Sequence, residues 1–214
     1  MALFSRKEAP FDRARIMSAA STARAKGNRK KAIAEYRRVL AALPDDCEVH
    51  AKIAPLLVEN KELDAAWASF RLAGEGYHAK GFADKAISIF KQAGSQLPWR
   101  VHAFERIAEL HLERERRGDA IKILVEARAL YRGRADRESA LRVLERLLAI
   151  DPDRLDAQLD VAWLLKKTGR KAEAHTLLED LVHKRAGPER RRVRKALFAL
   201  HPTPASLLRW WLNR

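Results

Sequence analysis

The sequence contains little cysteine, proline or glycine and has no long apolar run. Cys47 is its one cysteine, so no disulfide can form within the chain and no cysteine-based metal cluster is possible. With 8 prolines, 9 glycines and 47% hydrophobic residues among 214, the chain is expected to bury a core. No run approaches the ~18 to 20 apolar residues of a membrane span, and the first residues lack the apolar stretch of a signal peptide. We therefore expect a cytoplasmic protein.

The familiar motifs of catalysis are also missing. The chain has no phosphate-cradling G-x-x-x-x-G-K-[ST], no G-x-G-x-x-G, no H-E-x-x-H and no G-x-S-x-G, and its seven histidines are scattered. Glu105, Glu109 and Glu113 share one helix face and could bind a cation, but interleaved arginines favour a solvated face. His111 stands in a leucine register and is expected to be packed. We predict no enzyme activity, no cofactor and no metal site.

Positive charge is abundant and lies mainly at the two ends. The formal net charge is +15, of which residues 1–26 contribute +4 and residues 189–214 contribute +6. The long middle part mixes both signs, as is typical of helices with ion-paired surfaces. Basic ends of this kind leave one alternative function open, which is the binding of nucleic acid or an anionic membrane surface.

A 54-residue repeat organises the middle of the chain. Small residues recur at intervals of 34 and 20 residues, at Ala32, Ala66, Ala86, Ala120, Ala140 and Ala174. The segments 27–80, 81–134 and 135–188 align without gaps and bring Pro44, Pro98 and Pro152 into one register. Such a period predicts a stacked array. We expect one continuous domain, with a leading helix in residues 1–26 and a C-terminal cap in residues 189–214.

Each repeat is expected to form three helices and no strand. Apolar residues recur at three- and four-residue steps, as in Leu141, Leu144, Leu147 and Leu148, and no stretch alternates as a strand would. Pro55 falls inside an expected helix, where proline removes a backbone hydrogen bond. We predict a kink or an early helix end at that residue.

The pattern resembles the tetratricopeptide repeat, a 34-residue helix-turn-helix unit. Residues 67–100 carry the resemblance best, through Phe70, Ala73, Gly74, Tyr77, Gly81, Ala86, Phe90, Ala93 and Pro98. The resemblance covers about residues 13–188, in two overlapping sets of windows. It implies an all-α, right-handed helical-repeat solenoid of about 12 antiparallel helices. It further implies a non-enzymatic adaptor that recognises a peptide or protein segment on a concave face.

The family's concave-facing positions fall on two helices of this chain. The resemblance assigns ligand binding to Lys122, Val125, Ala129, Arg132, Asp156, Leu159, Trp163, Lys166 and Lys167. The basic members favour an acidic ligand. Trp163 aligns with Pro55 and Glu109, and Trp99 aligns with two aspartates, so neither register behaves as core. Both tryptophans are predicted to be exposed, and Trp163 is expected to be an interface anchor.

The C-terminal segment combines a basic run with tryptophans. The candidate docking residues are Arg190, Arg191, Arg192, Arg194, Lys195, Trp210 and Trp211. Three interpretations stay open: a helix that caps the last repeat, a segment that docks on an anionic membrane, and a tail that docks on a protein. The expected partner is a protein or peptide, with nucleic acid and peripheral membrane contact as the lesser alternatives and self-association of the array as a third.

Overall fold

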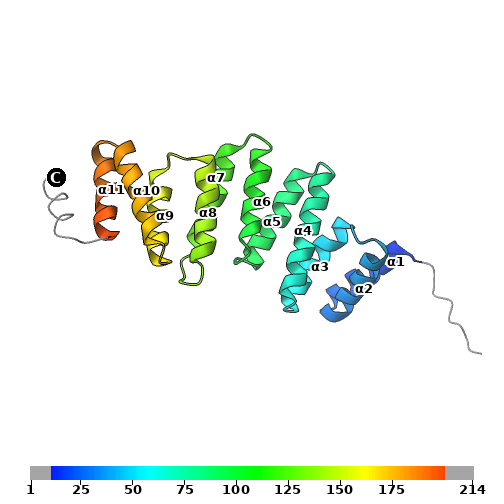
Figure 1. The fold of residues 1–214 in the computed structure, drawn as a ribbon. Helices are drawn as coiled ribbons and strands as arrows, with labels where there is room; N and C mark the ends of the chain where they lie inside the picture. Colours follow the sequence, from blue (N-terminus) through cyan, green and yellow to red (C-terminus); the bar gives the residue numbers. More distant parts are fainter. Residues whose placement is uncertain (1–10, 201–214) are drawn as a thin grey trace, which may run out of the picture. The chain divides into compact units, whose positions relative to one another are not determined.

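The computed structural model describes residues 11–200, and all regular elements in that range are α-helices (Figure 1). The helices are α1 (Arg13–Ala25), α2 (Arg29–Ala42), α3 (Cys47–Glu59), α4 (Leu63–Ala79), α5 (Ala83–Gln96), α6 (Val101–Leu112), α7 (Arg117–Leu130), α8 (Arg137–Ile150), α9 (Leu155–Lys167), α10 (Lys171–Lys184) and α11 (Gly187–Leu200). The all-α prediction is confirmed, and the eleven helices of the described part are close to the expected twelve.

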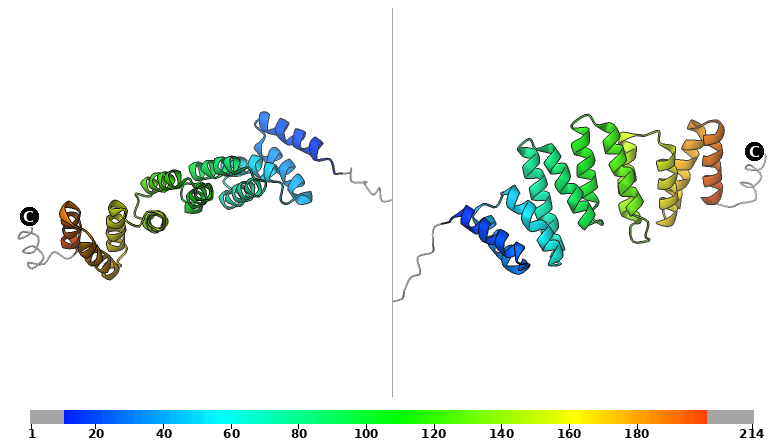
Figure 2. Two further views of the ribbon diagram at one scale, coloured as in Figure 1. Left: turned by 90° about the horizontal axis from the view of Figure 1, so that it is seen from above. Right: turned by 180° about the vertical axis from the view of Figure 1, so that it is seen from behind.

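The helices form two compact units. The first ends at Arg100 and contains α1 to α5, and the second begins at Val101 and contains α6 to α11. Within each unit, helices that follow one another in the chain pack together, as α1 and α2 do in Figure 2. Helices two apart also touch, namely α3 with α5, α6 with α8 and α9 with α11. The division into three 54-residue units stays a prediction.

The starts of the helices follow the 54-residue interval. Helices α2, α5 and α8 begin at Arg29, Ala83 and Arg137, and the two helices after each of them are spaced in the same way. The six recurring alanines, which lie in α2, α4, α5, α7, α8 and α10, are all fully buried. A methyl side chain lets two helix backbones approach closely, so the alanine repeat marks the positions where helices cross.

Large side chains fill the space beside these crossings. Tyr36, Phe70 and Phe90 are almost completely buried, whereas Tyr77 is only half-buried. Gly74 of α4 lies directly under the ring of Phe90 of α5, and a Cβ at Gly74 would lie 2.4 Å from that ring. Glycine is therefore required at position 74 for α4 and α5 to pack as they do.

Side-chain caps explain where the first helices begin. Asp12 and Asn28 accept hydrogen bonds from the backbone N–H groups of Arg15 and Lys31, at 3.0 and 3.2 Å. Asp46 accepts from two N–H groups of the first turn of α3. Short polar acceptors at these positions satisfy donors that have no partner inside the helix.

Of the two outcomes predicted at Pro55, the early helix end is wrong, and the kink stays a prediction. Helix α3 continues through Pro55 as far as Glu59. The residues on both sides of the proline, Ala54 and Leu56, are buried, and α3 packs extensively against α4. Burial of this apolar face outweighs the loss of one backbone hydrogen bond. Between Phe11 and Leu200, no helix has the length and apolar character needed to cross a bilayer.

Candidate functional site

A groove of about 590 Å³ lies in the second unit, along α7, α8 and α9. Its lining residues come from these three helices, from the turn before α9 and from one arginine of α11, and they are Val125, Arg128, Leu144, Leu147, Arg154, Asp156, Ala157, Leu159, Asp160, Trp163 and Arg192. Helix α8 packs against both α7 and α9 and contributes the buried Leu144 and Leu147. The groove therefore has an apolar base with a wall on each side.

Exposed apolar surface lines the two walls. The side chains of Val125 on α7 and Trp163 on α9 are 39% and 49% exposed. The Nζ atom of Lys167 lies 5.6 Å from the centre of the Trp163 ring, which is the geometry of a cation–π interaction. Trp163 is thus partly exposed, as its register predicts, and it presents a large rigid face to a binding partner.

Ion pairs across the groove neutralise most of its charge. Arg128 Nε of α7 lies 3.0 Å from Asp160 Oδ2 of α9, and Arg192 Nη2 of α11 lies 2.5 Å from Asp156 Oδ1. Arg154 is the third arginine of the lining, and its nearest carboxylate, Asp151, is 3.7 Å away and outside the groove. Each arginine of the lining therefore has a carboxylate partner, and the partner of Arg154 lies outside the lining. Partly exposed pairs of this kind contribute only ~0 to 1 kcal/mol each, so a ligand could replace them.

Four of the nine predicted ligand-binding residues line this groove: Val125, Asp156, Leu159 and Trp163. The other five are not among its lining residues. Lys122 and Ala129 are exposed on α7, and Arg132 Nε donates to the carbonyl of Ala129 at 2.8 Å. Lys166 Nζ donates to the carbonyl of Ala199 at 2.5 Å and so binds the end of α11. Lys167 reaches the groove only through Trp163. Binding of a ligand by any of these residues stays a prediction.

Sequence reasoning missed most of the charged lining. Arg128 aligns with Ala20 and Gly74 in the 54-residue register. An arginine at a position that is otherwise small could have identified Arg128 as a candidate site residue. Asp160 and Arg154 gave no comparable signal. Arg192 was assigned to a basic C-terminal run, whereas its guanidinium pairs with Asp156 at the groove.

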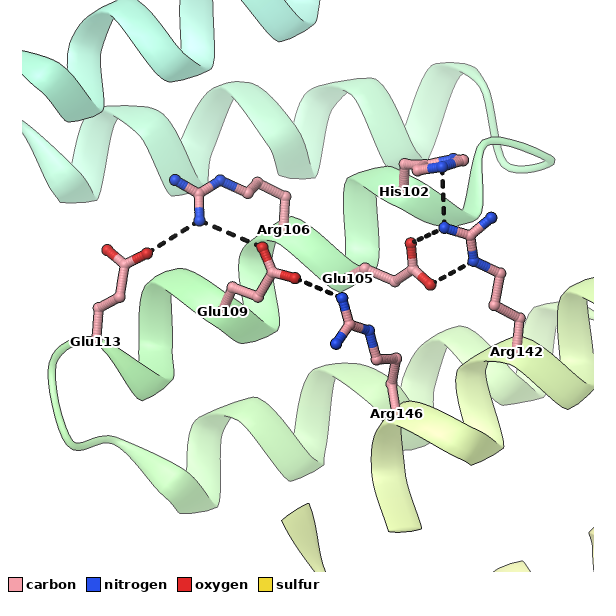
Figure 3. A network of polar contacts seen from close by, with 7 residues as sticks. All are labelled: His102, Glu105, Arg106, Glu109, Glu113, Arg142 and Arg146. Atoms are coloured by element: carbon pink, nitrogen blue, oxygen red, sulfur yellow. Dashed lines mark hydrogen bonds and ion pairs between the residues drawn. The ribbon is translucent and has the colours of Figure 1, made fainter. Parts of the chain in front are cut away.

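A network of charges joins α6 to α8 (Figure 3). Glu105 is 5% exposed and accepts two hydrogen bonds from Arg142, at 2.6 and 2.8 Å, and Arg142 also contacts His102 Nε2 at 2.9 Å. One turn further along, Glu109 pairs with Arg146 of α8 and with Arg106. Glu113 pairs with Arg106 as well.

The prediction of a solvated face is therefore wrong for Glu105. Helix α8 packs against α6 and brings a guanidinium to the buried carboxylate, so this charge is buried together with its partner. The network links helices and leaves these carboxylates paired. Among the described residues, no group of three or more His, Cys, Asp or Glu side chains could hold a metal ion. His111 is buried, as its register predicts.

Helix α11 packs against α9 and α10, with Val193 and Leu200 buried. Arg190 Nε donates to the carbonyl of Arg185 at 2.6 Å, so two arginines of the basic run hold α11 in place. Arg191 and Lys195 are exposed, and Arg194 is half-buried. This arrangement is the one expected of a capping helix. Trp210 and Trp211 lie outside the described residues, and the docking interpretations of the segment stay predictions.

Comparison with known families identifies part of the chain. The family model described as tetratricopeptide repeat matches residues 131–197, which include α8, α9, α10 and most of α11. Residues 131–197 are therefore similar to the tetratricopeptide repeat. Helices α8 and α9 of the groove lie in this matched region. Such repeats serve generally as protein-interaction scaffolds, because stacked helix pairs create extended binding surfaces.

Solved structures with similar helices were also found. A tetratricopeptide repeat protein from Parabacteroides merdae is 15% identical, with 91% of this chain and 89% of that chain covered and a TM-score of 0.31. BtubC from P. vanneervenii is 19% identical over 89% of this chain and 83% of its own, with a TM-score of 0.38. MamA is 16% identical, with 80% of this chain and 90% of that chain covered and a TM-score of 0.30. With scores below 0.5, these similarities add no argument. No curated protein matches the chain.

Proposed function

We propose that the chain is a non-enzymatic adaptor that binds a peptide or protein segment in the groove along α7, α8 and α9. The observation that carries this proposal is the partly exposed Trp163 on the wall of a groove with an apolar base. A 590 Å³ groove falls in the size range of sites that hold a few side chains. The match of residues 131–197 to an interaction repeat supports the same class of function.

The lining favours a ligand that combines an apolar side chain with an acidic one. Val125, Leu159 and Trp163 offer apolar contact on the two walls. Lys167 and Arg154 supply positive charge beside these contacts: the two aspartates of the lining pair with other arginines, and Arg154 has only a long 3.7 Å ion pair with Asp151. An aliphatic or aromatic side chain would pack on Trp163, and a neighbouring carboxylate would pair with Arg154 or Lys167.

Selection from a random-peptide display library on the full chain tests this proposal. We expect the selected peptides to share a large apolar residue next to Asp or Glu. Substitution Trp163→Ala should weaken the binding of a selected peptide by roughly 30-fold, because loss of an interface anchor costs about 2 kcal/mol and each 1.4 kcal/mol is a factor of ten.

Trp99→Ala is the matched control. Trp99 is also 49% exposed but lies in the first unit, outside the groove. We expect it to change peptide affinity by less than about twofold, the range of an uninvolved surface residue. Equal losses for Trp99→Ala and Trp163→Ala, or selected peptides that bind Trp163→Ala as tightly as the native chain, would refute the groove as the binding site.

Binding of nucleic acid or an anionic membrane surface through the basic ends is the alternative. Part of the C-terminal basic run holds α11 against its neighbours, which leaves fewer charges for a polyanion. Phosphate-driven binding weakens steeply with salt, whereas a groove anchored by an apolar side chain does not. Affinity for the selected peptide that changes little between low and physiological salt would favour the groove.

A further inference from the structure

A second hollow, of about 610 Å³, lies between α1 and α2 in the first unit. The side chains at this hollow that can donate hydrogen bonds are Arg15, Ser18, Thr22, Lys26, Asn28 and Lys31. Three are cationic, and none of the described residues that line the hollow is a carboxylate. Gly27 has a φ of +72°, the left-handed region that glycine favours. It makes the turn that brings Lys26 and Asn28 to the same hollow.

A small side chain lines the hollow at a position where the other two copies carry a large one. Ala23 lines it, and the equivalent positions of the 54-residue register carry Tyr77 and Tyr131. Tyr131 is buried and Tyr77 half-buried, so in those copies a phenol ring occupies the position at which the first copy has a methyl group. The small residue at this position is therefore specific to the first copy.

The cations of the hollow differ from their neighbours in having no carboxylate partner. Nearby arginines are paired, Arg13 with Asp46 and Glu48, and Arg29 with Glu59. Within residues 11–200, Arg15, Lys26 and Lys31 take part in no ion pair. The closest acid in sequence, Asp12, caps α1 through the backbone N–H of Arg15. Three unneutralised positive charges therefore converge on one small space.

The start of α2 adds to this positive charge. Asn28 and Lys31 place the N-terminus of α2 at the hollow, and the helix dipole makes that end partially positive. The equivalent helices α5 and α8 offset this charge with Asp84 and Glu138 in their first turns, whereas α2 carries Lys30 at that position. The first copy thus has a lysine where the repeat otherwise has an acid.

We propose that this hollow, the α1–α2 anion site, binds a phosphate monoester or pyrophosphate group, a function separate from the groove of the second unit. Such a group carries about two negative charges and several acceptor oxygens in one small volume. It could therefore meet the cations while Ser18, Thr22 and Asn28 donate hydrogen bonds. A carboxylate fits the hollow less well than a phosphate, because its single negative charge would face three positive ones. A nucleic-acid strand is disfavoured because no aromatic side chain lines the hollow for base stacking.

Calorimetric titration of the full chain with inorganic pyrophosphate tests the proposal, at about 0.15 M salt where distant charges are screened. We expect saturable binding that Lys26→Gln combined with Lys31→Gln weakens at least tenfold. Arg24→Gln combined with Arg38→Gln also removes two positive charges, from α1 and from the second half of α2, but at positions outside the lining, and should weaken binding less than threefold. Equal losses for the two double variants would overturn the proposal, because they would indicate diffuse attraction to a basic surface.

A second variant tests the hollow without changing charge. Ala23→Tyr restores the residue of the other two copies and should abolish pyrophosphate binding, with folding checked by circular dichroism. If Ala23→Tyr does not fold, the double variant Lys26→Gln/Lys31→Gln decides whether the hollow binds pyrophosphate. Absence of pyrophosphate binding to the native chain, or tighter binding of a poly-glutamate peptide or single-stranded DNA, would overturn the assignment.

Vesicles distinguish the two sources of such a phosphate. One set contains phosphatidylinositol bisphosphate, and the other contains phosphatidylserine at equal total charge. Preferential binding to the first set, lost in Lys26→Gln/Lys31→Gln, would identify a lipid headgroup. Pyrophosphate binding without vesicle binding would identify a soluble phosphate compound. Equal binding to both sets, unaffected by the lysine pair, would contradict the site.

Discussion

Replacing Arg142 by alanine should lower the stability of the second unit by about 2–3 kcal/mol. Glu105 is buried and receives both of its short hydrogen bonds from this one guanidinium. Breaking a buried ion pair from one side typically costs ~3–5 kcal/mol, because the remaining charge has no partner. The Arg142 side chain is 47% exposed, so water can enter and compensate in part. For this reason we expect a loss of about 2–3 kcal/mol, below the typical range for a buried pair.

Arg146→Ala provides the matched control one turn further along α8. Arg146 pairs with Glu109 of α6, but the two side chains are 53% and 39% exposed. We expect a loss of less than about 1 kcal/mol, as for most surface ion pairs. Urea unfolding followed by circular dichroism gives the two free energies, and hydrogen exchange of α6 and α8 assigns the transition to the second unit. A loss of 2 kcal/mol would lower the melting temperature by roughly 8 °C or more in a unit of this size.

A double substitution separates burial of charge from loss of contact. Glu105→Leu together with Arg142→Leu leaves no buried charge, so it should cost less than Arg142→Leu alone. The coupling free energy between the two positions should exceed about 1 kcal/mol. If Arg142→Ala and Arg146→Ala lower the free energy of unfolding by the same amount, within about 0.5 kcal/mol, then burial of Glu105 does not make its ion pair more stabilising than an exposed one.

Two further predictions concern local packing and pH. Gly74→Ala should destabilise the first unit by about 1–3 kcal/mol, because its Cβ would overlap the ring of Phe90; Gly118→Ala, where no atom lies within 4 Å, should be neutral or stabilising in the same urea assay. Burial raises the pKa of Tyr131 from 10.0 to about 12. Its contribution to stability is therefore present below about pH 10 and is lost as the pH rises towards 12, and unfolding curves of Tyr131→Phe should lack this part of the alkaline decline.

The 54-residue repeat in the sequence is what made the helix positions and part of the core predictable. Helix starts 54 residues apart and the buried alanines follow directly from residues that recur in the sequence. Pro55 shows the limit: a local rule predicted a kink or an early helix end, and the helix, packed against α4, does not end there. Local propensity is the weaker effect wherever a helix buries one whole face.

The charges of the groove could not be predicted because their partners are distant in sequence. Arg128 meets Asp160 on another helix, and Arg192 meets Asp156. Which arginine lies close enough to which aspartate depends on how α7, α9 and α11 pack, and the residue types alone do not determine that packing. The α1–α2 anion site did leave a signal, because Ala23 and Lys30 depart from the residues of the other copies. Such departures indicate a special site only once the surrounding space is known.

Trp163 is the site residue for which the register alone was informative, and its folding role can be tested directly. In the same register the helix accepts Pro55 and Glu109, so packing of the repeat does not need an indole there. Trp163→Ala should change the free energy of unfolding by less than about 0.5 kcal/mol, as expected for a surface residue. Leu164→Ala, at the next residue, removes a side chain that is 1% exposed and should cost about 2–5 kcal/mol. Losses of similar size for the two variants would mean that the indole stabilises the fold, and the 30-fold loss of peptide affinity could then no longer be attributed to an anchor.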